Sequence, residues 1–197
     1  MSGLEIRPLR GADLRAALPE VARLRIAVFR DWPYLYDGDA AYEERYLAPY
    51  AGSEAAIVVG AFDGSRLVGA ATGTPLADHA EDFAAAFEGT GIDIARVFYC
   101  AESVLLPAYR GQGAGHAFFD AREAHARARG FTMCCFCAVL RPDDHPARPE
   151  GYRPLDPFWR KRGYAPLPGV VARFDWTDLG ESGPTAKPLQ FWIRDLA

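Results

Sequence analysis

Three glycines alternate in the segment YRGQGAG, at Gly111, Gly113 and Gly115. Arg110 precedes them, and apolar residues at helical spacing follow. Glycines that alternate at the start of a helix let backbone N–H groups approach a ligand closely, most often a phosphate, because no Cβ stands in the way. The segment therefore predicts a phosphate-binding loop, and its neighbours must decide which phosphate it binds.

Two common phosphate motifs do not fit this loop. A Walker loop and a G-x-G-x-x-G dinucleotide fingerprint, both counted from Gly111, need a glycine where His116 stands. Counted from Gly113, the fingerprint meets Phe118 instead. The segment does fit the pattern Arg-x-x-Gly-x-Gly, which begins at Arg110 and lies between an apolar strand pattern and a helix pattern.

The segments VLLPAYRGQGAG (104–115) and FWRKRGY (158–164) resemble the Gcn5-related N-acetyltransferases (GNAT), which transfer an acyl group from coenzyme A to an amine. The resemblance implies acetyl-CoA as cosubstrate, with its pyrophosphate on the N–H groups of the glycine loop. The cofactor-binding residues implied by the motif are Leu105, Leu106, Arg110, Gly111, Gln112, Gly113, Ala114, Gly115 and Phe158.

In this family the strand before the loop splays away from its neighbour, and its exposed backbone groups pair with the pantetheine arm. The resemblance assigns that role to the backbone of Leu105 and Leu106. The N–H of Leu105 would also polarise the thioester carbonyl, which is a catalytic role of the oxyanion-hole type.

Glu102 is the candidate general base. Acylation needs a free amine, so a base must take a proton from the ammonium ion. Glu102 stands inside an apolar strand pattern, three residues before Leu105, and burial makes a carboxylate a stronger base. Two other interpretations stay open: an ion pair with a buried arginine such as Arg153, or a position that faces solvent.

The leaving thiolate has no obvious acid partner. Many family members carry a tyrosine four residues before the glycine that is Gly163 here, and this sequence has Trp159 at that position. An indole N–H donates a hydrogen bond but does not deliver a proton near neutral pH. Tyr152, Tyr99, water, or departure without an acid are the alternatives, and packing is the simpler role for Trp159.

Two segments are candidates for holding the acceptor amine. Residues 29–46 concentrate aromatic side chains, which suit a small-molecule pocket but also an ordinary loop over the core. Residues 145–156 are rich in proline, and their arginines could grip the carboxylate of an amino acid or acidic metabolite. The candidate acceptor-binding residues are Trp32, Tyr34, Arg148, Tyr152 and Arg153.

The elements that must position these groups follow from hydrophobic periodicity. The expected helices span residues 13–30, 40–47, 79–89, 114–130 and 155–163, the last with Asp156 as N-cap. The expected strands span residues 4–9, 55–62, 66–76, 95–106, 131–140, 169–176 and 188–196. With the family resemblance, the sequence predicts one domain over 1–197 of the α/β (α+β) class. Helices would flank a central mixed, mostly antiparallel sheet that contains a splayed parallel pair.

The composition is that of an ordinary globular protein, half apolar with a formal charge of −4, which argues against a nucleic-acid partner. The N-terminus lacks the apolar run of a signal peptide and no segment is long enough to span a bilayer, so we expect a cytoplasmic protein without a membrane partner. Three of the four cysteines lie in FTMCCFCAV, where a strand would point Cys134 to the opposite face from Cys135 and Cys137. This arrangement predicts buried reduced thiols rather than a metal site. The sequence leaves a homodimer open.

These observations predict an acetyl-CoA-dependent N-acetyltransferase that acts directly on a primary amine of a small molecule or peptide. A non-catalytic acyl-CoA-binding or sensing module on the same fold is the main alternative, and an ATP-binding protein is a weaker one. A covalent route through Cys100 would need an activated thiol, and nothing in the sequence activates it.

Overall fold

The computed structural model describes residues 3–196, apart from the side chains of residues 80–82. Within these residues the strands form one eight-stranded sheet in the order β1-β2-β3-β4-β6-β8-β7, and β5 pairs with β3 beside this path. The strands are β1 Glu5–Leu9, β2 Ile57–Asp63, β3 Arg66–Pro75, β4 Val97–Tyr99, β5 Ser103–Leu105, β6 Met133–Val139, β7 Ala165–Trp176 and β8 Thr185–Asp195. The α-helices are α1 Gly11–Phe29, α2 Ala40–Gly52, α3 Ala80–Phe87, α4 Ala114–Ala128 and α5 Asp156–Lys161. The pair β4–β6 is parallel and the other pairs are antiparallel, as the sequence predicts.

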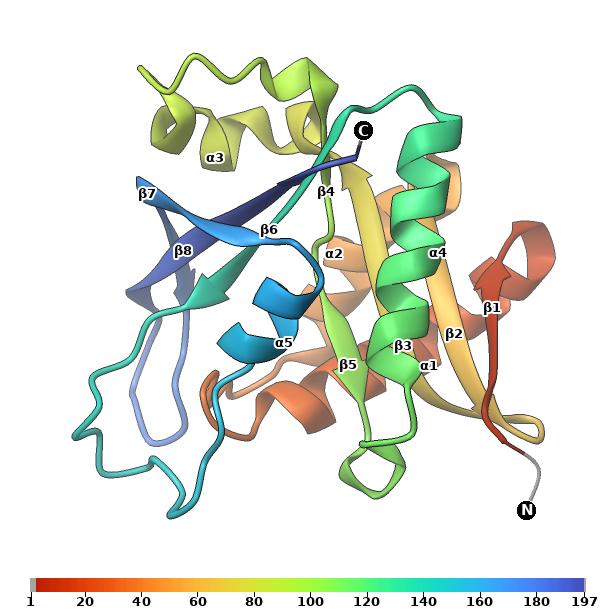
Figure 1. Cartoon of the computed structure of the whole chain (residues 1–197). Coiled ribbons are helices and arrows are strands. Elements are labelled where there is room, and N and C mark those ends of the chain that lie inside the picture. Colours follow the sequence, from red (N-terminus) through yellow and green to blue (C-terminus); the bar gives the residue numbers. More distant parts are fainter. Residues whose placement is uncertain (1–2, 197) are drawn as a thin grey trace.

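Helices cover both faces of the sheet (Figure 1). Helices α4 and α5 lie on one face, and α1, α2 and α3 lie on the other. Strand β6 shows how the alternation of its side chains serves both layers: Cys134 packs in the core beneath α4, whereas Cys135 and Cys137 pack with α3. All four cysteines are buried free thiols, which confirms the sequence-based prediction.

The segment expected as one strand over 95–106 is two strands: β4 and β5 both pair with β3, but only β4 also pairs with β6. The N–H of Cys100 still donates to Cys135 on β6. The N–H of Ala101 instead donates to Thr72 on β3, and Glu102 accepts from the N–H of Thr72. The chain thus stays beside β3 but loses its pairing with β6 across residues 100–102, which opens the sheet between β5 and β6.

Other boundaries also differ from the sequence-based expectation, among them the starts of β7 and β8, which come four and three residues earlier. Helix α2 continues past Leu47 to Gly52, because Leu47 and Tyr50 on its inner face are both buried in the core. Asp156 is the first residue of α5 rather than its N-cap, and Leu155 occupies the cap position. Pro19 lies within the continuous helix α1.

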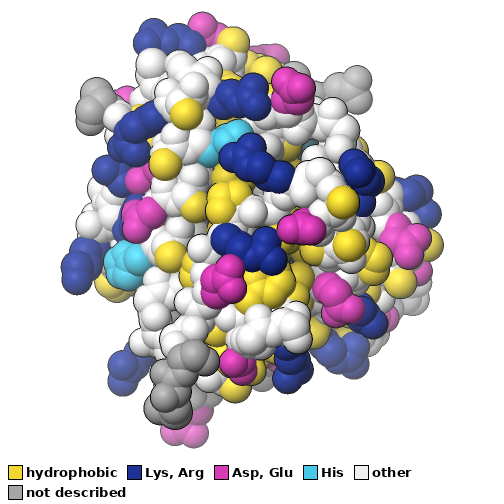
Figure 2. All heavy atoms as spheres, turned by 90° about the vertical axis from the view of Figure 1, so that its right-hand side faces the viewer, with side chains coloured by type: hydrophobic (Ala, Val, Ile, Leu, Met, Phe, Trp, Pro, Cys, Tyr) yellow, Lys and Arg dark blue, Asp and Glu magenta, His cyan; other side chains and the backbone are white. Residues whose placement is uncertain are grey.

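The face of the molecule that carries β1 mixes acidic and basic side chains (Figure 2). This surface does not gather charge of one sign. Among the helices within residues 3–196, none has both the length and the apolar character that crossing a bilayer requires.

Candidate active site

The glycine loop opens helix α4. Gly113 is the N-cap residue and has a φ of +86°, and Gly111 has a φ of +77°, a left-handed conformation that favours glycine. In an α-helix the first N–H groups, here those of Ala114 and Gly115, have no acceptor within the helix, and the helix dipole makes this end positive. The start of α4 is therefore suited to an anionic ligand.

The backbone of β5 alternates between β3 and the opposite side. The N–H of Leu106 donates to Val68 at 3.0 Å, and Val104 pairs with Ala70. The alternation of an antiparallel ladder therefore turns the N–H and carbonyl of Leu105 away from β3. The Leu105 carbonyl accepts a hydrogen bond from Nε of Arg110 at 3.3 Å. The pantetheine role expected for Leu105 is compatible with this arrangement, whereas the N–H of Leu106 is already used within the sheet.

A groove of about 900 Å³ starts at the glycine loop and follows the opening between β5 and β6. We call it the loop groove. Arg110, Gly113 and Phe158 line it, and the Phe158 ring lies 3.4 Å from where a Cβ on Gly115 would stand. Gly111, Ala114 and Gly115 line it as well, but Gln112 does not.

A second cavity, of about 450 Å³, lies between α2, α3 and β7 on the other side of Glu102. We call it the ring-lined cavity, because aromatic side chains form much of its wall. These rings belong to Phe29, Tyr34, Tyr36, Tyr42, Tyr46, Tyr50, Phe83, Tyr99, Phe174 and Trp176.

The two cavities share five lining residues: Phe29, Tyr34, Ala101, Glu102 and Cys137. A ligand in the loop groove and a ligand in the ring-lined cavity would therefore meet at these side chains. Glu102 is the carboxylate of this shared set. The interruption between β4 and β5 places it there.

Glu102 belongs to a buried group of charges that we call the Arg25 cluster: Arg25, Glu43 and Glu102. Nη1 of Arg25 lies 2.7 Å from Oε2 of Glu102, and Nε of Arg25 contacts Oε2 of Glu43. The Tyr46 hydroxyl also donates to Oε2 of Glu102, at 3.1 Å. Burial works against the charge on Arg25, but Glu102, Tyr46 and Glu43 together raise its pKa above the ordinary value.

The second oxygen of Glu102 is different. Oε1 is buried and has no hydrogen-bond partner within the described residues, although the side chain is only 6% exposed. Leaving a buried carboxylate oxygen without a partner is costly unless a ligand or water completes it. Of the two alternatives to a base role, the structure shows the ion pair, but with Arg25, and Arg153 is exposed.

Arg122 fixes the backbone that carries Glu102. Its guanidinium is fully buried on α4 and donates from Nη1 to the carbonyls of Thr72 and Glu102, at 3.1 and 2.9 Å. Nη2 donates to the Ser103 hydroxyl at 2.9 Å. Arg122 therefore ties α4, β3 and β5 together at the interruption.

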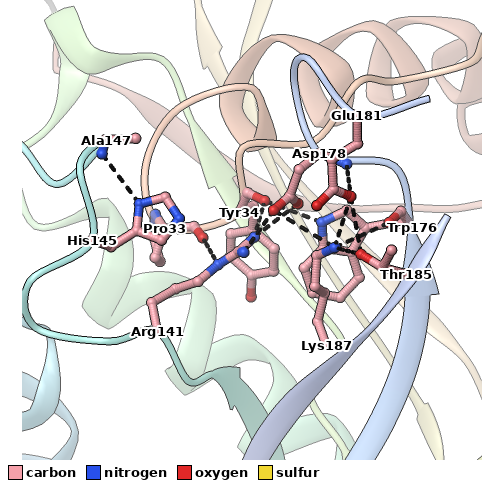
Figure 3. A network of polar contacts seen from close by, with 10 residues as sticks. All are labelled: Pro33, Tyr34, Arg141, His145, Ala147, Trp176, Asp178, Glu181, Thr185 and Lys187. Carbon is pink, nitrogen blue, oxygen red and sulfur yellow. Dashed lines mark hydrogen bonds and ion pairs between the residues drawn. The ribbon is translucent and has the colours of Figure 1, made fainter. Parts of the chain in front are cut away.

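A second group of charges, the Arg141 cluster, consists of the largely buried side chains of Arg141, Asp178 and Lys187 and of the exposed Glu181 (Figure 3). Arg141 donates to both carboxylate oxygens of Asp178, at 2.6 and 2.9 Å. It also donates to the backbone carbonyls of Pro33 and Tyr34, at 2.9 and 2.7 Å. The cluster thus anchors the loop between α1 and α2. This loop carries Tyr34, one of the five residues that line both cavities.

The proline-rich loop contributes less than expected. Arg148 pairs with Asp143 and lies over the ring of Tyr152, and both Arg148 and Tyr152 line the loop groove beside Trp32. Arg153 is exposed and lines neither cavity. The loop therefore does not bring its two arginines together around one ligand.

Aromatic packing explains Trp159. Its ring lies 4.9 Å from that of Phe136 and 5.2 Å from that of Trp192. Of the candidate tyrosines, Tyr152 lines the loop groove, whereas Tyr99 lines the ring-lined cavity and its hydroxyl contacts Sγ of Cys137 at 3.2 Å. Neither belongs to the shared set, which does include Tyr34.

The thiols near the junction are poorly suited to a covalent route. Burial raises the pKa of Cys137 to about 12, so its thiol stays protonated. A hydrogen bond with Cys134 lowers the pKa of Cys100, against the effect of burial, but the Cys100 side chain is 2% exposed and packs within the core. Within the described residues, His, Cys, Asp and Glu side chains form no group of three suited to a metal ion.

The basic segment 160–162 is partly committed to other contacts. Arg162 pairs with Asp120 at 2.7 Å and with Glu123 at 3.1 Å, which fixes α5 to α4. Arg160 lies over the Trp192 ring and lines the loop groove. Of these two arginines, Arg160 is therefore the one placed to reach a ligand in the groove.

Arg25, Arg122 and Arg141 are the site residues that sequence reasoning missed. The first two carry a signal in the sequence: Arg25 follows Val21 by four residues, and Arg122 follows Phe118 by four, so each stands on an apolar helix face. A charged residue on such a face must find a partner inside the protein. Arg141 follows directly after a strand and carries no comparable signal.

Comparison with known proteins agrees with this geometry. The sequence profile of the Acetyltransferase (GNAT) family matches residues 22–150. The chain therefore belongs to the GNAT acetyltransferase family, as its sequence resemblance indicates. None of the curated proteins matches the sequence.

Solved structures share the fold along the whole chain. A ribosomal-protein-alanine N-acetyltransferase from Brucella melitensis is 15% identical, with a TM-score of 0.63 over 97% of this chain and 99% of that one. The yncA protein from Salmonella typhimurium is 14% identical, with a TM-score of 0.62 over 100% and 95%. A phosphinothricin acetyltransferase from Sinorhizobium meliloti is 17% identical, with a TM-score of 0.58 over 100% and 90%.

Proposed function

We propose that this protein is an acetyl-CoA-dependent N-acyltransferase that transfers an acetyl group directly to the primary amine of a small molecule. The observation that carries the proposal is the position of Glu102 on the wall of both cavities, with a buried carboxylate of which one oxygen has no partner among the described residues. Donor and acceptor would enter from opposite sides and meet at a base.

The loop groove fits coenzyme A. The yncA protein and the phosphinothricin acetyltransferase were both solved with acetyl-CoA. In this chain, the amides at the start of α4 and the side chain of Arg110 would hold the pyrophosphate. Phe158 would pack beside the pantetheine arm, and the backbone of Leu105 would pair with it.

The chemistry then needs three protein groups at the junction. Oε1 of Glu102 takes a proton from the ammonium ion, directly or through one water, while Arg25 holds Oε2. The free amine attacks the thioester carbon, so that a C–N bond forms, the C–S bond breaks, and the second proton lost by the nitrogen passes to the leaving thiolate, directly or through water. The N–H of Leu105 stabilises the oxyanion that develops in this step.

Many family members have a tyrosine where this chain has Trp159. Tyr34 is our candidate for the group that instead donates a hydrogen bond to the leaving thiolate. It is the tyrosine that lines both cavities. Burial, with a further contribution from Cys137, raises the pKa of Tyr34 above its ordinary value, so the phenol keeps its proton near neutral pH and serves as a hydrogen-bond donor. A thiol leaves readily as a thiolate, so we expect Tyr34→Phe to lower kcat by only about ten-fold, with an unchanged KM for acetyl-CoA.

The experiment that tests the function is release of free coenzyme A from acetyl-CoA in the presence of a panel of primary amines, with the acetylated product identified by mass spectrometry. Calorimetry with coenzyme A and with ATP tests the donor separately, and tighter binding of ATP would overturn it. A non-catalytic sensor would bind coenzyme A but acetylate none of the amines. The presence of a second cavity that meets the groove at a carboxylate favours the enzyme.

A further inference from the structure

We propose that the acceptor is a primary amine carried on a short chain from an aromatic ring system and lacking a carboxylate. This inference rests on the proposed N-acyltransferase function and names the substrate class of that site. It follows from three features of the ring-lined cavity: the charges at its inner end, the aromatic side chains of its wall and the exposed charges at its rim.

The inner end of the ring-lined cavity selects a cation. Arg25 is the buried cation there, and it is shared between Glu43 and Glu102, so one positive charge faces two carboxylates. Oε1 of Glu102 adds a buried acceptor to which no donor among the described residues is bonded. An ammonium group supplies donors and one positive charge, and so completes both the hydrogen bonding and the charge balance.

The same end rejects a carboxylate on the carbon next to the amine. Such a group would lie close to Glu102 in a site where Arg25 is already engaged by two acids. A buried anion without a cationic partner is strongly unfavourable. This differs from the sequence-based hypothesis of an amino acid gripped by Arg148 and Arg153, which line the loop groove and the surface rather than this cavity.

The wall selects an aromatic body. The ring of Phe83 lies 5.2 Å from that of Tyr99 in an edge-to-face arrangement and 6.4 Å from that of Phe174, and Tyr34 lies 5.9 Å from Trp176. Rings that hold one another in place form a rigid surface against which another ring packs edge to face. A cavity of about 450 Å³ lies in the size range of small-molecule sites.

The rim carries exposed charges. Arg45, Asp78 and Asp175 line the outer part of the cavity, so that two acids accompany one base. A polar substituent on the far side of the ring, uncharged or cationic, suits this rim better than an acidic one. The acceptor that fits best therefore places its ammonium group at the inner end of the cavity and carries no acidic group at the outer end.

The test compares amines that differ by one feature. Tryptamine and 2-phenylethylamine are matched with tryptophan and phenylalanine, which add only the carboxylate, and with propylamine, which lacks the ring. We expect kcat/KM for tryptamine to exceed that for tryptophan by about a hundred-fold and that for propylamine by at least about ten-fold. Equal or higher values for the amino acids or for propylamine overturn the substrate class and leave the transferase function standing.

Two matched aromatic variants locate the effect. Phe174→Ala removes a ring from the ring-lined cavity, and we expect about a ten-fold higher KM for tryptamine with little change for acetyl-CoA. Phe158→Ala, in the loop groove, should instead raise the KM for acetyl-CoA and change that for tryptamine little. Thermal melts monitored by circular dichroism check that both variants fold, and a Phe174→Ala variant that folds but keeps its tryptamine KM contradicts the assignment of the pocket.

Calorimetry separates the inference from the function on which it rests. Tryptamine should bind the wild-type protein more tightly than tryptophan even if no amine is acetylated. Acetylation of peptides or amino acids but not of arylalkylamines supports the function and overturns the inference. Binding of tryptamine that matches or falls below that of tryptophan also overturns it.

Discussion

The Arg25 cluster and the Arg141 cluster are both groups of interacting charges, yet they differ in composition and in burial, because Glu181 of the Arg141 cluster is exposed. The Arg25 cluster sets one cation against two carboxylates, Glu43 and Glu102, and leaves Oε1 of Glu102 without a partner within the described residues. The Arg141 cluster sets Arg141 and Lys187 against Asp178 and Glu181.

The difference separates a group built for chemistry from a group built for support. In the Arg141 cluster, Lys187 lies 3.6 Å from Asp178 and 3.2 Å from Glu181, so its charges balance and its acids have cationic partners. Arg141 also donates to two backbone carbonyls of the loop that carries Tyr34 (Figure 3). The Arg25 cluster carries an excess negative charge that a bound ammonium ion would neutralise.

Changing one carboxylate of the Arg25 cluster at a time should have the largest effect on catalysis. Glu102→Gln removes the proposed base, and we expect kcat to fall by about a hundred- to ten-thousand-fold, with coenzyme A affinity retained. Glu43→Gln is the matched control, since Glu43 contacts the same arginine but lines neither cavity, and its loss of kcat should stay within about ten-fold. Steady-state kinetics and calorimetry measure both quantities, and similar losses in the two variants would remove Glu102 from the mechanism.

Removing Arg25 should have the largest effect on stability. Arg25→Met leaves two buried carboxylates facing each other without their cation, and breaking a buried ion pair from one side costs about 3–5 kcal/mol. Arg23→Met on the same helix is the control, because Arg23 is 68% exposed and its pair with Glu20 contributes about 0.5 kcal/mol or less. Urea unfolding measures both variants, and an Arg25→Met variant as stable as Arg23→Met would show that Glu43 and Glu102 do not depend on this cation.

The sequence alone identifies the parts of this site that depend on local chain geometry. The glycine loop is visible because its left-handed residues and exposed amides belong to neighbouring positions, and Glu102 is visible as a lone acid in an apolar strand. The arginine that pairs with Glu102 is 77 positions away, and the sequence offers many arginines, so Arg25 could not be distinguished from Arg153. The break between β4 and β5 was hidden for the same reason, since it depends on Arg122 and on the loss of pairing with β6 after β4.

Removing Arg141 should destabilise the protein less than removing Arg25. Asp178 keeps Lys187 as a partner in Arg141→Met, so we expect a loss of about 1–3 kcal/mol, the range for hydrogen bonds to charged groups. The Tyr34 loop loses two anchoring hydrogen bonds, so the KM for the amine should rise while that for acetyl-CoA changes little. The exposed Arg173 on β7 gives the control variant Arg173→Met, and an Arg141→Met variant with unchanged kinetics would restrict the cluster to a structural role.

The pH dependence of stability, through Asp178 of the Arg141 cluster, gives the smallest expected effect. Burial alone would raise the pKa of Asp178, but hydrogen bonds from Arg141 and the charges of Arg141 and Lys187 lower it below the ordinary value of 3.8. A carboxyl whose pKa is lower in the folded than in the unfolded state stabilises the fold fully above the unfolded value. That contribution is lost as the pH falls through the folded value.

Asp178→Asn should therefore be less stable than the wild type by a constant amount between about pH 5 and pH 8, and the difference should shrink by about 1 kcal/mol below about pH 4. Glu181, whose pKa hydrogen bonds from Thr185 and Lys187 also lower, is present in both proteins, so its titration largely cancels in the comparison. Urea midpoints measured across this range test the expectation. A difference that stays constant down to pH 3 would mean that Asp178 has the same pKa in the folded and the unfolded protein, so that Arg141 and Lys187 do not stabilise its charged form.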